Sequence, residues 1–190
     1  RKYCINSAAV RVMGLPKFDS LCFPQRYPLN PEIKEKAQGR RIVLWKVHFP
    51  KVIYENGKTI LVTPKISEYI KFAGKLEQYS TLFFIFMPHP RFKEFNQDRK
   101  VQRELAQLME CLLSKENVHI DNNDDYRNSL MHADGIIVDR SAVMVEAAAT
   151  GVPVLYMYNK EFDEPLTEAI RPLVDSYYHG TTCLDMERFL

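Results

Sequence analysis

Short, nearly continuous apolar runs alternate along the chain with stretches in which apolar residues recur at helical spacing. This rhythm is typical of βαβ units, because parallel strands covered by helices are apolar on both faces. The predicted strands are Ala9–Met13, Arg41–Val47, Thr81–Met87, Val118–Asp121, Gly135–Asp139 and Val154–Tyr158. The predicted helices are Pro31–Gln38, Ile66–Gln78, Asp98–Ser114, Asp125–His132, Ala142–Thr150 and Glu164–Val174. The pattern predicts an α/β fold with a Rossmann-like, doubly wound parallel sheet.

The connections between these elements carry turn signals. The Asn56-Gly57 pair indicates a tight turn, which predicts a small hairpin between Val52–Tyr54 and Thr59–Val62. The proline- and charge-rich stretch from Leu15 to Gln38 is expected to be a loop region apart from its helix candidate. The chain shows no internal repeat and no second composition regime, so we expect a single domain.

Length and charge narrow the function classes. The 190 residues, 46% of them apolar, suffice for one domain with a substantial core, residues 1–190. A net charge of +2 is too balanced for a nucleic-acid scaffold, so no nucleic acid partner is expected. The four cysteines lack the spacing of a zinc site or a disulfide framework, which favours a reducing, cytoplasmic setting. We expect no metal and no cofactor. Because the chain begins without Met, we interpret it as a fragment of a longer protein.

Candidate chemistry gathers directly after the predicted strands. In doubly wound sheets, ligands bind in the crevice beyond the carboxyl ends of the strands. His48, His89 and Arg140 each follow a predicted strand, beside small or polar neighbours. This concentration of basic side chains favours an anionic ligand. No P-loop and no GxGxxG motif occurs, which argues against an NTPase or a dinucleotide enzyme.

The segment from Asp139 to Glu146 carries the strongest signal. Ser141 is expected to cap a helix that starts near Ala142, and the first helical turn offers unpaired N–H groups to a phosphate. The small side chains of Ser141 and Ala142 would let an anion reach the backbone, and Arg140 could add positive charge. The alternative is that Ser141 only caps its own helix.

Two further side chains are candidates for ligand contacts. The prolines around His89 fix the direction of its imidazole, which could bind a phosphoryl oxygen or donate a proton. The alternative is a histidine that satisfies a loop carbonyl. Glu146 could hold the two hydroxyls of a ribose, although a solvated helix glutamate is the competing interpretation. We expect Trp45 to belong to the core and Asp121–Asp125 to form a solvated loop with a helix cap.

Several of these segments together resemble a known family. They are Gly14–Asp19, Leu44–His48, Phe83–Pro90, Asp125–Leu130, Ala133–Met144 and Gly151–Tyr156. In this order they are similar to the carboxyl-terminal half of the CDP-glycerol glycerophosphotransferases, the teichoic-acid and capsule polymerases of GT-B fold. The resemblance covers nearly the whole chain, with its specific parts in the Pro88-His89-Pro90 segment and the Asp139-x-Ser141-x-x-Met144 segment.

The resemblance implies a donor-binding half-enzyme. His89 and Ser141 would grip the diphosphate of a CDP-activated donor, with Glu146 a weaker candidate for the ribose and His48 a further contact. An acceptor hydroxyl of a cell-envelope polymer would attack the β-phosphorus of CDP-glycerol, and CMP would leave. The family's general base lies in the amino-terminal acceptor domain, which is absent here, so the isolated chain should fold yet catalyse nothing. The full-length protein is expected at the inner face of the cell membrane.

Two other functions remain open. The Asp139-x-Ser141 arrangement, with Glu146 and the later Gly151–Leu155 segment, also occurs in sugar-nucleotide GT-B glycosyltransferases and UDP-sugar epimerases. Either class would retain a pyrophosphate-nucleotide ligand in the same crevice. The third possibility is a non-catalytic interaction domain, in which case no nucleotide should bind.

Overall fold

The structure is a computed structural model that describes residues 14, 16–55, 57–95, 97–123, 125–162 and 166–190. Its strands are β1 (Arg41–Val47), β2 (Val52–Glu55), β3 (Lys58–Leu61), β4 (Leu82–Pro88), β5 (Val118–Ile120), β6 (Gly135–Val138), β7 (Val154–Met157) and β8 (Tyr178–Gly180). Its α-helices are α1 (Pro16–Leu21), α2 (Pro31–Ala37), α3 (Ile66–Ala73), α4 (Arg99–Leu113), α5 (Arg127–Met131), α6 (Val143–Glu146), α7 (Arg171–Asp175) and α8 (Cys183–Phe189). The 3₁₀ turns are η2 (Pro24–Arg26), η3 (Leu76–Gln78), η4 (Pro90–Glu94) and η5 (Ala147–Thr150).

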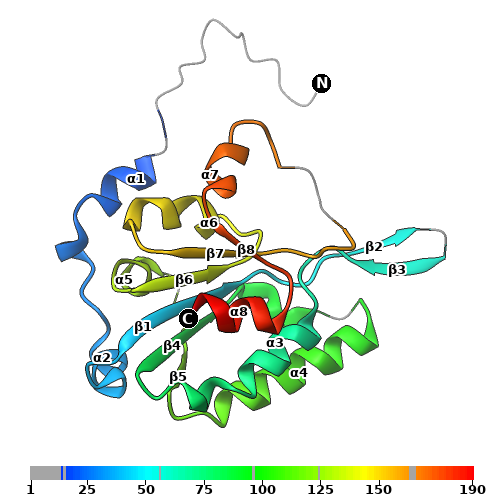
Figure 1. Cartoon of the computed structure of the whole chain (residues 1–190), viewed down its shortest axis with the longest axis horizontal. Coiled ribbons are helices and arrows are strands. Elements are labelled where there is room, and N and C mark those ends of the chain that lie inside the picture. Colours follow the sequence, from blue (N-terminus) through cyan, green and yellow to red (C-terminus); the bar gives the residue numbers. More distant parts are fainter. Residues whose placement is uncertain (1–13, 15, 56, 96, 124, 163–165) are drawn as a thin grey trace, which may run out of the picture.

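Six strands form one parallel sheet in the order β5-β4-β1-β6-β7-β8. Numbered along the chain, this is the 3-2-1-4-5-6 order of a Rossmann-like sheet. The chain winds outward from β1 to β5, then returns to the other side of β1 and winds outward to β8 (Figure 1). The strand order therefore reverses between β1 and β6, which confirms the predicted doubly wound α/β fold.

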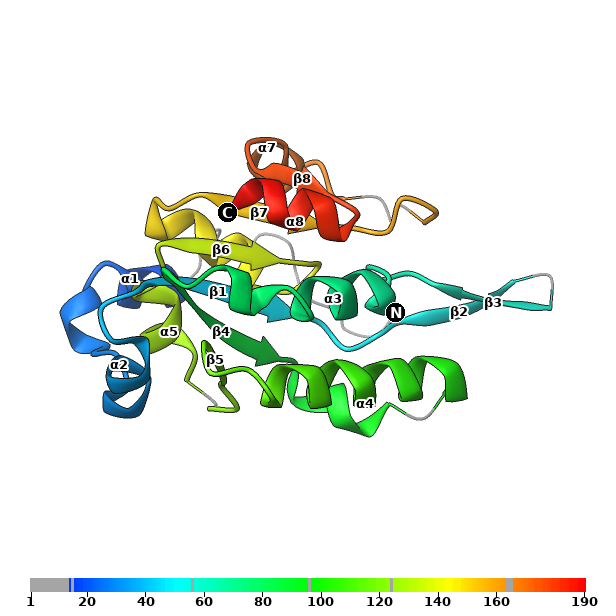
Figure 2. The ribbon, with the colours of Figure 1, turned by 60° about the horizontal axis from the view of Figure 1, so that its bottom comes forward.

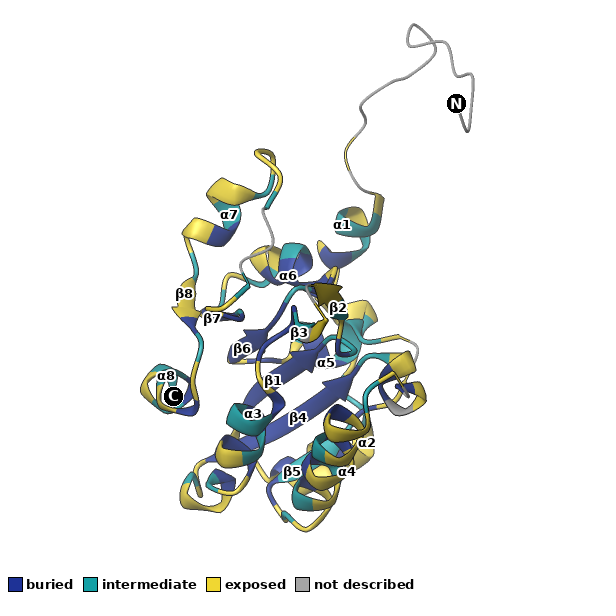
Figure 3. Cartoon of the chain, turned by 90° about the vertical axis from the view of Figure 1, so that its right-hand side faces the viewer, coloured by how far each residue is buried: buried dark blue, intermediate teal, exposed yellow. Residues whose placement is uncertain are grey.

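Helices cover both faces of this sheet. Trp45 and Phe86 belong to the face that α3, α4 and α8 cover, whereas Leu44 and Ile85 face α2, α5 and α6. Figure 3 shows the buried strands between these helical layers. Trp45 is fully buried and makes edge-to-face contacts with three aromatic rings, as expected of a core residue. The two apolar layers bury the sheet on both sides and hold its strand ends in place.

Local sequence signals account for several element boundaries. The Asp98 side chain accepts hydrogen bonds from the N–H groups of Lys100 and Val101 and so caps α4. Asn30 caps α2 in the same way, with Pro31 in the first helical position. The predicted hairpin is present as antiparallel β2 and β3, which project from the sheet beyond the carboxyl end of β1 (Figure 2).

Some predicted elements differ from the structure. The strand predicted at Ala9–Met13 lies outside the described residues. The helix predicted at Glu164–Val174 begins at Arg171, where Pro172 sets the start of α7. The expected loop region 15–38 contains α1 and η2 besides the predicted helix. The sequence interpretation also missed β8 and α8 at the end of the chain.

Candidate functional site

The carboxyl ends of β1, β4, β5 and β6 surround a cavity of about 750 Å³ at the point where the strand order reverses. This larger cavity lies where doubly wound sheets bind their ligands. Its wall includes His48, His89, Ser141 and Ala142, which the sequence placed at this edge, and also Lys17, Lys46, Asp121 and Tyr126. The structure therefore brings four of the six predicted site residues to one cavity.

Lys46 is the functional candidate that the sequence interpretation missed. It lies within β1 and is only 7% exposed. Its ammonium group donates one hydrogen bond of 3.3 Å, to the carbonyl of Pro88, and it forms no ion pair within the described part of the chain. Burial lowers the pKa of Lys46, and the charges of Asp139 and Asp121 oppose this shift. An ammonium with donors to spare in the wall of a cavity suits a bound anion.

Ser141 does not cap the following helix, contrary to prediction. The N-cap residue of α6 is Ala142, and no side chain there accepts a capping hydrogen bond. A tight turn places the Ser141 N–H 2.7 Å from the carbonyl oxygen of Asp139. As a result the Ser141 hydroxyl is buried in the cavity wall, and it has no hydrogen-bond partner among the described residues. Such a hydroxyl is available to a ligand.

The helix after Ser141 is also shorter than predicted. In place of one helix over Ala142–Thr150, a single α-helical turn, α6, continues into the 3₁₀ turn η5. One turn supplies little helix dipole, so the dipole argument for a phosphate site loses most of its force. The case for an anion now depends on the Ser141 hydroxyl and the neighbouring cations.

His89 lines the larger cavity and caps η4. Its Nδ1 accepts a hydrogen bond of 3.1 Å from the N–H of Arg91. Nδ1 therefore carries no proton, and the neutral ring carries its proton on Nε2. Burial lowers the pKa of His89, and the positive charges of His48 and Lys46 lower it further. Among the described residues no carbonyl accepts a hydrogen bond from His89, and its Nε2–H can donate to a ligand oxygen.

His48 has the opposite tautomer. Its Nδ1 lies 2.9 Å from the carbonyl oxygen of Phe49, which can only accept, so Nδ1 carries the proton and Nε2 is left as an acceptor. The His48 ring lies 4.9 Å from the His89 ring between centroids. Burial lowers the pKa of His48. The two imidazoles therefore offer one Nε2 lone pair and one Nε2–H close together.

Asp139 fixes the backbone between the two central strands. Both of its carboxylate oxygens lie 2.9 Å from the backbone N–H of His48, which donates to them. Burial raises the pKa of Asp139 to about 7, although the His48 N–H and the charge of Lys46 act in the opposite direction. Asp139 is therefore a positioning group that joins the end of β6 to the end of β1.

Glu146 is buried rather than solvated. It is 2% exposed, forms an ion pair of 2.8 Å with Lys17, and accepts a hydrogen bond from the Tyr126 hydroxyl. Burial and the Glu146 carboxylate together raise the pKa of Tyr126 to about 12. Lys17 and Tyr126 line the larger cavity in front of Glu146. The interpretation of Glu146 as a solvated helix glutamate is therefore wrong, and its contact with a ribose remains a prediction.

The expectation of a solvated loop at Asp121–Asp125 is wrong for its first residue. Asp121 is 2% exposed and accepts hydrogen bonds from the Ser129 hydroxyl and from the N–H of Asn123. It lies in the wall of the larger cavity, close enough to Lys46 for its charge to oppose the lowering of the Lys46 pKa by burial. A carboxylate at the end of β5 thus limits where an anion can sit.

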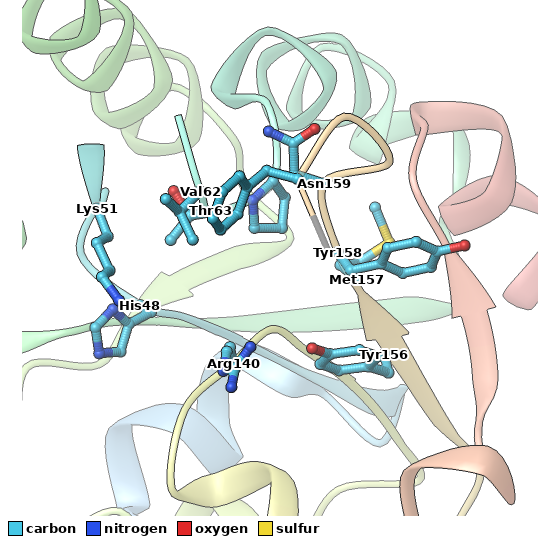
Figure 4. Close-up of a pocket in the computed structure, with 11 residues that line it drawn as sticks. His48, Lys51, Val62, Thr63, Arg140, Tyr156, Met157, Tyr158 and Asn159 are labelled. Atoms are coloured by element: carbon cyan, nitrogen blue, oxygen red, sulfur yellow. The ribbon is translucent and has the colours of Figure 1, made fainter. Parts of the chain in front are cut away.

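Arg140 faces a different cavity from Ser141, although the two residues are neighbours in sequence. It lines a smaller cavity of about 270 Å³ together with Lys51, Thr63 and Tyr156 (Figure 4). His48 lines both cavities. The predicted phosphate-binding group is therefore divided, with Ser141 and Ala142 on one side of His48 and Arg140 on the other.

Two kinds of feature are missing from the described residues. They contain no group of three or more His, Cys, Asp or Glu side chains that could hold a metal ion. Within the same residues, no helix combines the length and the apolar character that a membrane span requires.

Neither a protein-family model nor a curated protein matches the chain. Several solved structures are similar to it. The Neisseria meningitidis UDP-GlcNAc 2-epimerase bound to UDP-GlcNAc is similar over 97% of this chain and 47% of its own, with 19% identity and a TM-score of 0.56. The S. aureus MnaA–UDP complex matches over 96% of this chain and 45% of its own, with 20% identity and a TM-score of 0.59.

A further match extends the likeness to a third protein. The E. coli trehalose-6-phosphate structure bound with UDP-2-fluoro glucose covers 90% of this chain and 41% of its own, with 10% identity and a TM-score of 0.54. At these identities the likeness shows the fold alone. The neighbours are GT-B proteins, so the predicted Rossmann-like half of a GT-B fold is confirmed. The chain spans less than half the length of each of these structures.

Proposed function

We propose that this chain is the donor-binding half of a GT-B enzyme and that it holds a sugar nucleotide through its diphosphate in the larger cavity. One observation carries the proposal: Lys46, which is buried and makes a single hydrogen bond to the described residues, shares a cavity at the reversal point of the sheet with the Ser141 hydroxyl, which has no partner among those residues. Both features are unfavourable by themselves, and an anionic ligand would relieve both.

The charge of the cavity wall supports an anion. Within the described part of the chain, the charged side chains that line it are Lys17, Lys46 and Asp121, and Lys17 is paired with the Glu146 carboxylate behind it, so Lys46 is the cation offered to a ligand and His89 adds a neutral donor. Asp121 is already bonded to Ser129 and Asn123, so its charge is partly compensated. A diphosphate would neutralise Lys46 directly and would accept hydrogen bonds from several donors at once.

Each residue has a role in this proposal. Ser141 donates its hydroxyl to a phosphate oxygen, and the small Ala142 lets that phosphate approach the backbone. His89 donates its Nε2–H to the second phosphate, where it would stabilise the charge that develops during transfer. In the full-length enzyme, His89→Ala is expected to lower turnover on the order of 10²-fold.

The remaining contacts concern the rest of the donor. Lys17 and Tyr126, which hold Glu146, would meet the ribose or its phosphate, with Glu146 behind them. The solved structures support a uridine nucleotide as the first candidate, because two of them contain UDP and UDP-GlcNAc and a third contains UDP-2-fluoro glucose.

CDP-glycerol is the second candidate donor. It is favoured by the position of the two segments that carry the family resemblance, because His89 from one and Ser141 from the other line the same cavity. In this reaction an acceptor hydroxyl oxygen attacks the β-phosphorus, the bond to the CMP oxygen breaks, and the hydroxyl proton passes to a base. We assign that base, the binding site for the cell-envelope acceptor and any peripheral contact with a membrane to parts of the protein outside this chain.

A titration of nucleotides into the chain tests the proposal. UDP, CDP, UDP-GlcNAc and CDP-glycerol are compared by calorimetry in the wild type, Ser141→Ala and Ser141→Asp. Ser141→Asp should abolish binding because a carboxylate would face the phosphate, while Ser141→Ala should weaken it about tenfold. A preference for one base identifies the donor class. Binding that is equally tight in Ser141→Asp would refute the site, and a wild type that binds no nucleotide would favour an interaction domain.

A further inference from the structure

Two imidazoles meet in the wall of the larger cavity, and a third ring packs against both of them. The His48 and His89 rings lie 4.9 Å apart between centroids, and the Phe49 ring lies 4.3 Å from His48 and 4.9 Å from His89. The guanidinium of Arg91 lies over the Phe49 ring, 5.1 Å from its centroid. These contacts fix the two imidazoles at the cavity in which we propose that a diphosphate binds.

His48 presents the wrong group to a diphosphate while its ring is neutral. Its Nδ1–H donates to the Phe49 carbonyl, and no described residue bonds to its Nε2, which is an acceptor in this tautomer. A phosphate oxygen is also an acceptor, so the two lone pairs would repel each other. A proton on Nε2 removes this conflict, because the imidazolium offers an N–H and a positive charge at the same place.

His89 has no such place for a second proton. Its Nε2 already carries the proton of the neutral ring, and its Nδ1 accepts a hydrogen bond of 3.1 Å from the Arg91 N–H. A proton on Nδ1 would break that bond and with it the cap of η4. A proton on Nε2 of His48 breaks no hydrogen bond and strengthens the one to the Phe49 carbonyl. Of the two rings, His48 therefore takes up a proton at the lower cost.

The surroundings keep both rings neutral near pH 7. Burial lowers the pKa of each ring below the ordinary value of 6.5, and the positive charge of Lys46 acts in the same direction. The Phe49 carbonyl opposes this shift at His48, and Glu94 opposes it at His89. The other charged or titratable groups of the described residues that border the pair or its two cavities are Lys17, Lys51, Arg91, Asp121, Tyr126, Asp139, Arg140, Tyr156 and Tyr158. A negative charge within about 4–6 Å of an imidazole raises its pKa, so a bound diphosphate reverses this balance.

We propose that a nucleotide diphosphate draws one proton from solvent onto Nε2 of His48 as it binds, while His89 stays neutral. The new N–H donates to a phosphate oxygen, beside the Nε2–H of His89, and no bond of the ligand is formed or broken. This proton uptake depends on the proposed function, because the diphosphate is the charge that draws the proton.

Proton uptake makes the affinity for the nucleotide depend on pH. Because His48 binds its proton more tightly in the complex, the complex holds more protons at any pH between the two pKa values of His48. The affinity is therefore highest below the pKa of His48 in the free chain, which lies under 6.5. It falls by up to about tenfold per pH unit as the pH rises toward the pKa of His48 in the complex.

Calorimetry in buffers of different ionisation enthalpy counts the protons. UDP-GlcNAc and CDP-glycerol are titrated into the chain at several pH values between about 6 and 8. Both diphosphates are esterified at each end, so neither brings a terminal phosphate that titrates with a pKa of about 6. The heat of binding should depend on the buffer, with an uptake that reaches at least about half a proton per bound nucleotide, and the affinity should fall as the pH rises.

Two matched variants locate the proton. His48→Asn can still donate to the Phe49 carbonyl but cannot take up a proton, so it should bind without uptake and with a nearly constant affinity over this pH range. His89→Asn still accepts the Arg91 N–H and should bind more weakly than the wild type but with the same uptake. Lys71→Met, on the exposed side of α3, is the control and should match the wild type in both quantities. Uptake that remains in His48→Asn, which would place the proton on another group such as Asp139, or uptake that is lost in His89→Asn, would overturn the proposal.

Nitrogen NMR observes the protonation of the wild type directly. The chain has five histidines, so the imidazole ¹⁵N resonances of His48 and His89 can be assigned with the two variants. At pH 7, His48 should change from its Nδ1–H tautomer to the imidazolium when the nucleotide binds, and His89 should keep its Nε2–H tautomer. A His48 ring that stays neutral in the saturated complex would overturn the proposal. Failure of both nucleotides to bind would contradict the proposed function itself, whereas binding without proton uptake contradicts only the role of His48.

Discussion

The larger and smaller cavities lie on either side of His48 and are built differently. The larger one is formed mainly by residues at the ends of β1, β4, β5 and β6 and by the start of α6. The smaller one depends on a hairpin and on the segment after β7. Each contains one buried hydroxyl, Ser141 or Thr63, that has no hydrogen-bond partner among the residues that the structure describes, and of the two described walls only that of the larger cavity includes a carboxylate, Asp121.

This difference shows how much of a site follows from the sheet alone. In a doubly wound sheet the residues after the central strands must meet at one edge, whatever the loops do. The larger cavity therefore follows from the topology. The smaller cavity also needs hydrogen bonds that tie the hairpin to the segment after β7, such as that from Asn159 to Leu61.

The largest expected effect concerns Lys46. Lys46→Met should weaken binding of UDP or CDP about 10- to 100-fold, because a charge-assisted hydrogen bond to phosphate is lost. The same variant should be at least as stable as the wild type, because a buried ammonium with one hydrogen bond is replaced by an apolar chain of similar length. Calorimetry and urea denaturation measure the two effects. Lys71→Met is the control, and a Lys46→Met protein with wild-type affinity would exclude Lys46 from the site.

The next-largest effect concerns the contacts of Glu146 with Lys17 and Tyr126 beside the larger cavity. Lys17→Met leaves the buried Glu146 carboxylate with the Tyr126 hydroxyl as its one partner among the described residues and should lower the free energy of unfolding by about 1–3 kcal/mol. The double variant Lys17→Met/Glu146→Gln should recover part of this loss, because the uncompensated charge is gone. Urea denaturation of Lys17→Met, Glu146→Gln and the double variant completes a double-mutant cycle. Strictly additive effects would show that the pair is not coupled.

A pair of substitutions separates the two roles of His89. His89→Ala should weaken nucleotide binding about tenfold and lower stability by about 1 kcal/mol or less, because the cap of η4 is lost. His89→Asn can still accept the Arg91 N–H and should restore the stability. Thermal unfolding and calorimetry are compared for both variants. Full nucleotide affinity in His89→Ala would mean that the Pro88–Pro90 segment serves only as a turn.

The smallest effect is a change in the pH dependence of stability. Burial raises the pKa of Asp139 to about 7, whereas an unfolded aspartate has a pKa of about 3.9. The folded chain therefore binds more protons between these values, and the stability that Asp139 contributes is complete below about pH 4 and is lost as the pH rises through 7. The stability of Asp139→Asn relative to the wild type should consequently increase from pH 5 to pH 8. Denaturation at several pH values measures this difference, and a constant difference would contradict the assignment.

The sequence predicted the sheet well because its inner strands are continuous apolar runs. β1 and β4 are buried along nearly their whole length, and such runs are visible without any tertiary information. The outer strand β8 has only three residues, two of them exposed, so it carries no such pattern. The capping box of Thr182 and Asp185 was the available signal for α8.

The candidate site was less predictable from the sequence than the fold. Ser141 precedes a helix and has the chemistry of a cap, but a tight turn at Asp139 directs the chain so that Ala142 takes that position. Lys46 could have been found, since a lysine inside an apolar strand must be compensated by something. The separation of Arg140 and Ser141 into two cavities could not have been found from the sequence, because it depends on the direction of the backbone after β6.

The most direct test of the account is where a nucleotide binds. UDP is titrated into the methyl-¹³C-methionine chain, and the Met87 and Met157 resonances are followed together. The account predicts that Met87, in the wall of the larger cavity, shifts and saturates while Met157 in the smaller cavity stays in place. A saturable shift of Met157 with Met87 unmoved would contradict the account, because the diphosphate would then lie on the wrong side of His48.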